Sequence, residues 1–367
     1  MKKIALEFIN IIENHGFKAY IVGGFVRDYL MNINSHDIDI TTSATPKEIK
    51  KIFADITIKK NINDENSYGS ARVLYKNITF EVTTFREELD YRDNRHPSEV
   101  FYVNDLNIDL KRRDFTINAI CMDKDGKIID PLNGQSDISK RIIRTINNPA
   151  KSFKDDALRI LRAIRFSTTL NFKLDKDIEE AIEITKKYLK NISYERKKIE
   201  LDKIFASKNA KDGITLIIKL DLASLLDLNN LDKINDYTDL NLIWTIINSS
   251  KYPFTKHEKE LMKKINLALH YDNLNPHILY KYGLYVNTLA GINKGISKVE
   301  ITKAYNDLVI KTRTDIDIDV ASILKVLNQE PGPFLNHIYK NLEIEILNGN
   351  LENKKDEIIN YIKKHFN

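Results

Sequence analysis

A glycine pair followed closely by two aspartates constrains this chain more than any other feature. Tyr20-Ile21-Val22 predicts a short strand, Gly23-Gly24 a tight turn, and residues 25–30 the start of a helix. Asp37-Ile38-Asp39-Ile40 predicts a second strand, on which successive side chains point to opposite faces. Asp37 and Asp39 therefore share one face, and they repel each other unless a cation lies between them. Hard oxygen ligands beside a glycine turn suit Mg²⁺ and a nucleoside triphosphate.

A simpler interpretation also fits these two aspartates. Asp and Asn favour turns, and short motifs match often by accident, so an isolated Asp-x-Asp sequence is usually a surface loop. The other motifs of the chain decide between the two interpretations.

Composition excludes several classes of protein. The chain has 367 residues, 42% hydrophobic and 30% charged, which is enough for a substantial core under a polar surface. No stretch has the uncharged apolar length that spans a bilayer, and residues 1–13 predict an amphipathic helix and not a signal peptide. The single cysteine, Cys121, excludes an internal disulfide framework and a cysteine-based zinc cluster, so we expect a cytoplasmic protein. The net charge of +5 is compatible with binding nucleic acid but does not establish it.

Two kinds of secondary structure divide the chain. Up to about residue 130, short strands are mixed with helices, whereas beyond residue 152 apolar residues recur at helical spacing almost throughout. Asn147-Asn148-Pro149 marks the boundary. The sequence thus predicts an α+β head, with a small mixed or antiparallel sheet, followed by an extended all-α region. The predicted strands are residues 19–22, 37–41, 71–75, 78–85 and 117–122, and the predicted helices are residues 3–14, 25–31 and 46–53.

Two further groups of polar residues accompany predicted strands. Glu81 is the only acid on the strand 78–85; it either joins Asp37 and Asp39 as a third ligand or is an ordinary solvent-facing residue. In the segment 111–119, Arg113 can grip phosphate or ribose oxygens through its fork of donors, and Asp114 can accept from a ribose hydroxyl. A surface cluster of ion pairs explains Arg113 and Asp114 equally well.

A stripe of charge recurs within residues 155–166, which we predict to form one helix. Asp156, Arg159, Arg162 and Arg165 occur at every third position, so neighbours lie side by side. A solvated helix face with ion pairs would have this pattern, but three arginines leave an excess of positive charge that suits a polyanion.

Asp156 and Arg159 also suit the recognition of particular nucleobases. Cytosine and adenine both present an exocyclic amine beside an unprotonated ring nitrogen. A carboxylate accepts from the amine, and a guanidinium donates to the ring nitrogen. Uracil and guanine reverse that order of donors and acceptors. Such a pair would accept CTP and ATP and reject UTP and GTP.

Taken together, these motifs resemble the class II CCA-adding enzymes, which are tRNA nucleotidyltransferases of the DNA-polymerase-β-like superfamily. The resemblance covers residues 20–205, with weaker support in Pro331-Gly332-Pro333-Phe334, Leu347 and Asn353. One departure is Asp155, where the family commonly has Glu. Five family motifs occur in order: 23–28 with 37–39, 112–119, 130–134 with Asp137, 155–166, and 192–196 with Glu200-Leu201.

The resemblance implies an activity and a division of the chain. It implies Mg²⁺-dependent addition of CCA to the 3′ end of tRNA from CTP and ATP, with release of pyrophosphate. It divides the chain into a nucleotidyltransferase head (1–142), a neck that reads the base (143–205), a body (206–265) and a tRNA-binding tail (266–367). The implied catalytic residues are Asp37, Asp39 and Glu81, with Asp37 and Asp39 as metal ligands, and the implied nucleotide-binding residues are Gly24, Arg27, Arg113, Asp114, Asp156, Arg159, Arg162 and Arg165.

Three alternatives remain open at this point. A bacterial poly(A) polymerase shares the motifs, and an enzyme that adds only CC or only A is the second alternative. Residues 87–97 resemble the flexible loop that complete CCA-adding enzymes retain and CC-adding enzymes lack, which favours the complete activity. Their polar, proline-ended composition suits a mobile surface segment. A catalytically inactive tRNA-binding protein is the third, and the intact acidic residues argue against it.

Overall fold

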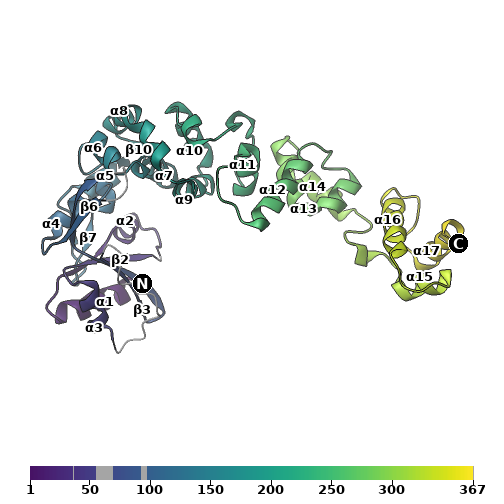
Figure 1. Cartoon of the computed structure of the whole chain (residues 1–367), viewed down its shortest axis with the longest axis horizontal. Coiled ribbons are helices and arrows are strands. Elements are labelled where there is room, and N and C mark those ends of the chain that lie inside the picture. Colours follow the sequence, from purple (N-terminus) through teal and green to yellow (C-terminus); the bar gives the residue numbers. More distant parts are fainter. Residues whose placement is uncertain (36, 55–68, 92–96, 367) are drawn as a thin grey trace. The chain divides into compact units, whose positions relative to one another are not determined.

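The computed structural model describes residues 1–35, 37–54, 69–91 and 97–366, without the side chains of residues 89–91, 97 and 98. These residues form two compact units, Met1–Asp227 and Leu228–Asn367. Strands are confined to the first unit, whereas the second is helical in its described residues (Figure 1). None of the helices in these ranges combines the length and apolar character needed to cross a membrane.

The first unit begins as the predicted mixture of strands and helices. Its strands are β1 (Ala19–Val22), β2 (Ile38–Thr42), β3 (Ser70–Tyr75), β4 (Ile78–Thr84), β5 (Arg86–Tyr91), β6 (Pro97–Tyr102), β7 (Cys121–Met122), β8 (Ile128–Ile129), β9 (Ile142–Ile143) and β10 (Lys173–Leu174). Its helices are α1 (Lys2–Asn14), α2 (Gly24–Leu30), α3 (Pro46–Ile52), α4 (Leu106–Lys111), α5 (Gly134–Lys140), α6 (Pro149–Asp155), α7 (Leu158–Leu170), α8 (Lys176–Thr185), α9 (Tyr194–Phe205) and α10 (Ala210–Lys219), with short 3₁₀ turns η1 (Thr116–Asn118), η2 (Lys186–Asn191) and η3 (Ser224–Leu226).

The second unit is built from helices with their own core. One hydrophobic cluster of this unit lies among its C-terminal helices and includes Ile323, Leu342 and Ile358. Its elements are η4 (Leu231–Lys233), α11 (Leu240–Ile247), α12 (Lys256–Ala268), α13 (Pro276–Asn293), α14 (Lys298–Asn306), η5 (Arg313–Asp315), α15 (Val320–Leu327), α16 (Phe334–Leu347) and α17 (Lys355–His365).

A mixed sheet organises the head. In the described residues its strand order is β3-β4-β2-β1-β7-β8. β1 pairs with β2 and β7 in antiparallel fashion, whereas β2 and β4 are parallel. The parallel register places Asp39 opposite Glu81, so these two side chains leave the same face of the sheet. The predicted α+β head followed by helices is therefore confirmed.

Three local predictions need correction. Residues 117–122 are not one strand: η1 precedes β7, because Thr116 donates to Asp137 and the amide of Ala119 bonds back to Thr116. Residues 87–97 are not a loop throughout, because β5 and β6 form an antiparallel ladder, while residues 92–96 lie outside the described ranges.

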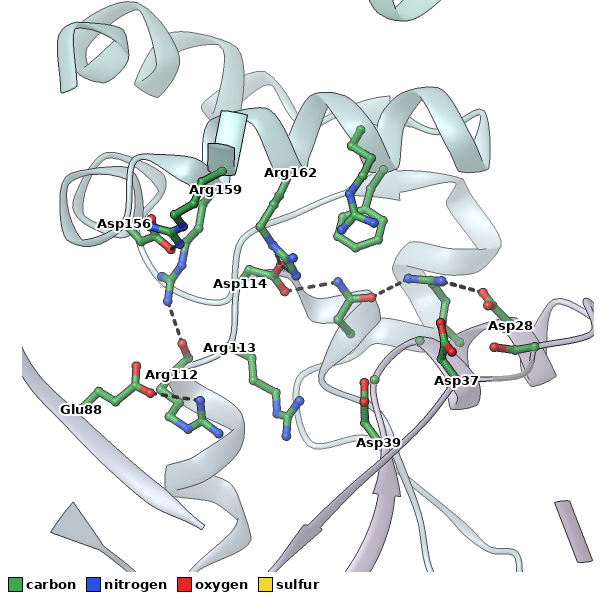
Figure 2. A pocket seen from close by; sticks show the side chains of 18 of the residues that line it. Asp28, Asp37, Asp39, Glu88, Arg112, Arg113, Asp114, Asp156, Arg159 and Arg162 are labelled. Carbon is green, nitrogen blue, oxygen red and sulfur yellow. Dashed lines mark hydrogen bonds and ion pairs between the residues drawn. The ribbon is translucent and has the colours of Figure 1, made fainter. Parts of the chain in front are cut away.

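The third correction concerns residues 155–166, which do not form one helix. α6 ends at Asp155; the next residue, Asp156, has an extended backbone with φ of −135° and ψ of 103°, and α7 begins at Leu158. The Asp156 carboxylate accepts from the amide of Leu158, and this side-chain bond to the backbone takes the place of the helical one. Asp156 and Arg159 thus lie on either side of a break between two helices (Figure 2).

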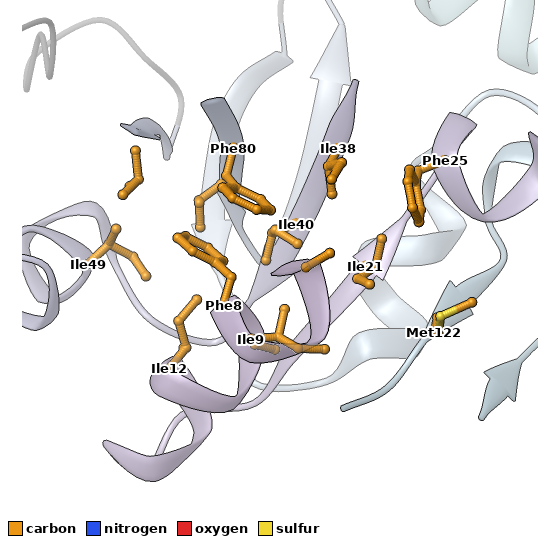
Figure 3. Packing of buried hydrophobic residues seen from close by; sticks show 14 of the residues in the cluster. Phe8, Ile9, Ile12, Ile21, Phe25, Ile38, Ile40, Ile49, Phe80 and Met122 are labelled. Carbon is orange, nitrogen blue, oxygen red and sulfur yellow. The ribbon is translucent and has the colours of Figure 1, made fainter. Parts of the chain in front are cut away.

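The core of the head fixes the strand that carries the two aspartates. Helix α1 buries Phe8 and Ile9 against the sheet, where they meet Ile38, Ile40 and Phe80 (Figure 3). The rings of Phe8 and Phe80 stack with centroids 4.1 Å apart. Because Ile38 and Ile40 are buried on this face, strand alternation turns Asp39 to the opposite face. The predicted alternation along β2 is confirmed.

Candidate active site

One pocket of about 680 Å³ collects nearly all of the site residues predicted from the sequence. Figure 2 shows Asp37 and Asp39 on one side, Asp156 and Arg159 on the other, with Arg113 between them. Glu81 is the one predicted site residue that does not line this pocket. The lining residues are Gly23, Gly24, Arg27, Asp28, Ser35, Asp37, Asp39, Arg86, Glu88, Arg112, Arg113, Asp114, Asn118, Asp156, Arg159, Arg162, Arg165, Phe166 and Arg196.

The carboxylates of Asp37 and Asp39 are open to the pocket and lack a compensating partner. Within the described residues, neither of them has a hydrogen bond or an ion pair. Burial by the surrounding protein, followed by the negative charge of Glu81, raises the pKa of Asp39. The positive charge of Arg113 offsets this rise only in part. A bound cation would relieve this repulsion.

The residues present fit a divalent metal ion. Carboxylate oxygens are the ligands that such hard ions prefer, and Asp37 and Asp39 present theirs to the same pocket. No cluster of three His, Cys, Asp or Glu side chains in the described ranges is close enough to hold one ion. The pair Asp37 and Asp39 is therefore the candidate ligand set, and bound phosphate oxygens and water would complete the coordination.

The glycine turn before α2 brings backbone close to the carboxylates. Gly23 has φ of 77°, and a Cβ there would lie 3.4 Å from Oδ2 of Asp39. A side chain at this position would be strained by the backbone and would crowd the carboxylate. One turn later, Arg27 is buried, with Nε and Nη2 bonded to Asp28 and Nη1 donating to Asn118 at 2.7 Å.

A chain of polar contacts continues from Asn118 into the helical part of the unit. Asn118 donates to Oδ1 of Asp114 at 3.2 Å, and Nε of Arg162 donates to Oδ2 of the same residue at 2.7 Å. Burial by itself would raise the pKa of Asp114, but the charge and hydrogen bond of Arg162, with Arg159 behind it, hold it at about 2. Asp114 is therefore ionised throughout the physiological range and fixes Arg162 at the pocket wall.

An aromatic ring supports three of the arginines. The guanidinium of Arg165 lies 4.0 Å from the centroid of the Phe166 ring, and those of Arg27 and Arg162 lie 5.2 and 5.5 Å from it. The electron-rich face of the ring attracts these cations, which otherwise repel each other. Nε of Arg165 also lies 2.6 Å from Glu200. The arginine-rich side of the pocket is thus supported by an aromatic ring and a carboxylate.

The two residues assigned to base recognition are held by their neighbours. Arg159 donates from Nη1 to the hydroxyl of Ser152 and from Nη2 to the carbonyl of Arg112, both at 2.8 Å. Oδ1 of Asp156 accepts from the Leu158 amide at 3.0 Å, and Oδ2 lies 3.4 Å from Nη2 of Arg196. Each group keeps unused hydrogen-bonding capacity toward the pocket.

Sequence reasoning missed the buried carboxylate that organises the arginines. Asp109 is fully buried and accepts from Thr41 at 2.9 Å, from Nε of Arg112 at 2.8 Å and from Nη2 of Arg113 at 3.2 Å. It lies three and four positions before these arginines, on helix α4, and that helical spacing was the signal available in the sequence. Arg112 also contacts Glu88 of strand β5 at 3.2 Å.

The fold and this pocket define a nucleotidyltransferase. Residues 19–144 match the family model described as the Poly A polymerase head domain, and residues 171–226 match the one described as a probable RNA and SrmB-binding site of polymerase A. Residues 252–362 match a model of tRNA nucleotidyltransferase domain 2. Enzymes of this class generally use a divalent metal ion.

Whole-chain relatives give the family. The CCA-adding enzyme of Staphylococcus haemolyticus is 34% identical over 395 residues, with 96% of each chain covered. That of Staphylococcus aureus strain bovine RF122 / ET3-1 is 35% identical over 389 residues, again with 96% of each chain covered. The solved Bacillus stearothermophilus CCA-adding enzyme in complex with CTP has a TM-score of 0.80 at 28% identity, covering 98% of this chain and 96% of its own. The chain belongs to the family of CCA-adding enzymes.

Proposed function

We propose that this enzyme adds CCA to the 3′ end of tRNA from CTP and ATP without a nucleic-acid template. The observation that carries the proposal is the single pocket in which the exposed pair Asp37 and Asp39 faces a wall of arginines and the base-reading pair Asp156 and Arg159. Family membership over 96% of the chain supports it. Mg²⁺ is the ion proposed for the two aspartates, because it is bound through one or two carboxylates together with substrate phosphates.

The reaction proposed is a nucleotidyl transfer. The 3′ oxygen of the tRNA forms a bond to the α-phosphorus of the nucleotide, the bond from that phosphorus to the bridging oxygen of the β-phosphate breaks, and pyrophosphate leaves. Mg²⁺ bound at Asp37 and Asp39 supplies charge stabilisation for the reacting phosphate. Gly24 and Arg27 cradle the triphosphate, and Arg113 and Asp114 contact the sugar and phosphate.

The remaining arginines and the helical parts of the chain hold the substrates. Arg162 and Arg165 bind the nucleotide or the primer end, where their positive charge is held in place by Asp114 and Glu200. Glu81 lies opposite Asp39 on the neighbouring strand but does not line the pocket. Its role is therefore indirect, through its effect on Asp37 and Asp39. Residues 143–205 form the neck, residues 206–265 the body and residues 266–367 the tail. The basic residues of neck and tail bind the tRNA acceptor arm by shape and phosphate contacts. A cytoplasmic location goes with this activity.

Asp156 and Arg159 read the base by hydrogen-bond pattern. Each carboxylate oxygen of Asp156 has a second lone pair and each terminal nitrogen of Arg159 a second hydrogen, so the protein contacts leave room for an incoming amine and ring nitrogen. An amine beside an acceptor occurs on cytosine and adenine, whereas uracil and guanine present the reverse order.

Nucleotide incorporation into truncated tRNA tests the function directly. Purified enzyme, Mg²⁺ and tRNA lacking its last three nucleotides are incubated with each labelled nucleotide alone and with CTP and ATP together. CCA addition gives exactly two C residues and one A only when both nucleotides are present, whereas a poly(A) polymerase would extend with ATP alone. An enzyme that adds only CC, or only A to tRNA ending in CC, would stop at that point. Binding of tRNA without incorporation would identify an inactive binding protein.

Removal of the carboxylate that reads the amine is expected to relax base selection. In Asp156→Ala, the acceptor that requires an amine is lost, so the rate of UTP incorporation relative to CTP should rise even as the total rate falls. Discrimination by a buried hydrogen bond is worth roughly 1–3 kcal/mol for each group left unpaired. Initial rates with the four nucleotides measure the ratio. An equal fall for CTP, ATP and UTP would mean that Asp156 serves only as an ion-pair partner.

The hairpin of β5 and β6 is expected to affect A addition more than C addition. The resemblance gives residues 87–97 a role in the change from C to A, and in the structure Glu88 reaches Arg112, whose carbonyl accepts from Arg159. Deleting residues 87–97 should spare C addition and damage the final A addition. Glu88→Gln keeps the backbone and should weaken A addition less, with Glu99→Gln on β6 as the control. Equal loss of both activities would indicate a purely structural hairpin.

A further inference from the structure

One aromatic ring lies among arginines that come from two separate helices. Phe166, on α7, lines the pocket, but only 6% of its surface is exposed. The guanidinium groups over this ring belong to Arg27 of α2 and to Arg162 and Arg165 of α7. Because the ring is almost wholly covered, it acts on a substrate through these arginines and not through a contact of its own.

The ring offsets the repulsion between the three cations. All three guanidinium carbons lie within 5.5 Å of the ring centroid, and that of Arg165 is the nearest at 4.0 Å. The electron-rich face of an aromatic ring attracts cations, whereas an aliphatic side chain fills the same space without this attraction. Phe115 packs against Phe166 with centroids 5.7 Å apart and the ring planes at 81°, which restrains the tilt of the Phe166 ring.

The shared ring also indicates that the three arginines serve one anion. Within the described residues, each arginine has a carboxylate partner of its own, and Phe166 is the contact that all three have in common. Arg27 lies on the helix that follows the glycine turn, on the side of the pocket proposed for the triphosphate. The carboxylate partners are Asp28 for Arg27, Asp114 for Arg162 and Glu200 for Arg165.

We propose that Phe166 is a positioning residue for the triphosphate: its ring holds Arg27, Arg162 and Arg165 close enough together for one bound triphosphate to contact all three. CTP and ATP carry the same triphosphate, so the ring supports both nucleotides equally and has no part in the choice of base. The inference rests on the proposed function, and it assigns Arg162 and Arg165 to the nucleotide and not to the primer end.

The test compares three variants of the full-length enzyme. Phe166→Leu removes the ring but keeps an apolar side chain, and Phe166→Tyr keeps the ring. Phe172→Leu is the matched control, because Phe172 is 4% exposed, follows the same helix, does not line the pocket and has no guanidinium over its ring within the described residues. For each variant we would measure kcat and KM for CTP, ATP and UTP on truncated tRNA, the equilibrium affinity for inorganic pyrophosphate with Mg²⁺ but without tRNA, and the melting temperature.

The expected result is a loss of affinity that is the same for both nucleotides. In Phe166→Leu, KM for CTP and for ATP and the dissociation constant of pyrophosphate should each rise about tenfold, which corresponds to about 1.4 kcal/mol. The ratio of UTP to CTP incorporation should stay as in the wild type. Phe166→Tyr and Phe172→Leu should bind pyrophosphate as the wild type does. If Phe166→Tyr fails to fold, the comparison of the two leucine variants decides.

A double variant tests whether the ring acts through the nearest arginine. Arg165→Gln removes the guanidinium that lies closest to the ring. In this background Phe166→Leu should lower the affinity for pyrophosphate by a smaller factor than in the wild type, because part of the interaction is already lost. An equal factor in both backgrounds would contradict action through Arg165.

Three other results are distinguishable from the expected one. If Phe166→Leu lowers only the melting temperature, as Phe172→Leu does, the ring is structural and the inference is wrong. If KM for CTP rises while the affinity for pyrophosphate is unchanged, the ring acts on the nucleoside and the inference is also wrong. If the wild-type enzyme binds pyrophosphate but adds neither C nor A to truncated tRNA, the proposed function is wrong, whatever the variants do.

Discussion

Asp37→Ala and Asp39→Ala are each expected to abolish the incorporation of both CTP and ATP while leaving tRNA binding largely intact. Both carboxylates open into the pocket without a protein partner among the described residues, and burial, followed by the charge of Glu81, raises the pKa of Asp39. Loss of a ligand at such a centre removes roughly several kcal/mol of transition-state stabilisation, so the rate should fall at least about a hundredfold. Single-turnover incorporation and a tRNA binding titration measure the two quantities.

An exposed aspartate of the same unit provides the control. Asp125→Ala, between β7 and β8 and outside the pocket, should behave as the wild type. Near-normal turnover in either pocket variant would remove that residue from the proposed metal site. Glu81→Ala tests the third acid separately: a loss as large as that of Asp39→Ala would give Glu81 a direct role.

Asp114→Asn is expected to destabilise the first unit by about 2 kcal/mol at neutral pH. The buried carboxylate has a pKa of about 2 in the folded protein against an ordinary value of 3.8, and each unit of difference corresponds to about 1.4 kcal/mol. Urea unfolding followed by far-ultraviolet circular dichroism measures the change. Tryptophan fluorescence would not serve, because the only tryptophan, Trp244, belongs to the second unit.

The dependence of this effect on pH has a definite sign. Because folding lowers the pKa of Asp114, its contribution to stability is complete above about pH 4 and is lost as the pH falls through about 2. The difference in unfolding free energy between wild type and Asp114→Asn should therefore shrink in that window and stay constant at higher pH. An exposed control, Asp125→Asn, should show no such window. A difference that did not change between pH 5 and pH 3 would contradict the ion pair with Arg162.

The sequence predicted the parts of this protein that depend on local pattern. Alternation in Asp37-Ile38-Asp39-Ile40 correctly predicted the buried and exposed faces of β2. The start of the helix predicted over 46–53 is also correct, since α3 begins at Pro46, behind a capping box of Thr45 and Glu48. The division into an α+β head and helices is also confirmed. The roles of the individual site residues stay predictions that only the experiments above can test.

The predictions from the sequence that were wrong or incomplete concern places where side-chain contacts override local propensity. Asp156 lies in an apolar-periodic segment that reads as one helix, yet its carboxylate bonds to the Leu158 amide and separates α6 from α7. The contact of Arg27 with Asn118 joins residues 91 positions apart, so no spacing in the sequence reveals it. Three arginines share the ring of Phe166, and no role for this residue was predicted from the sequence.

The buried carboxylate of Asp109 links the local unfolding of three segments of the head. Its carboxylate bonds to Thr41 of β2, to the amide of Arg86 at the start of β5 and to the arginines at the end of α4, and its side chain is fully buried. If one of these three segments separated from the others, the buried charge of Asp109 would lose partners within the apolar interior, which is unfavourable. Amide hydrogens of β2, the base of β5 and the end of α4 should therefore exchange with solvent in one cooperative event, although the chain order places these segments far apart.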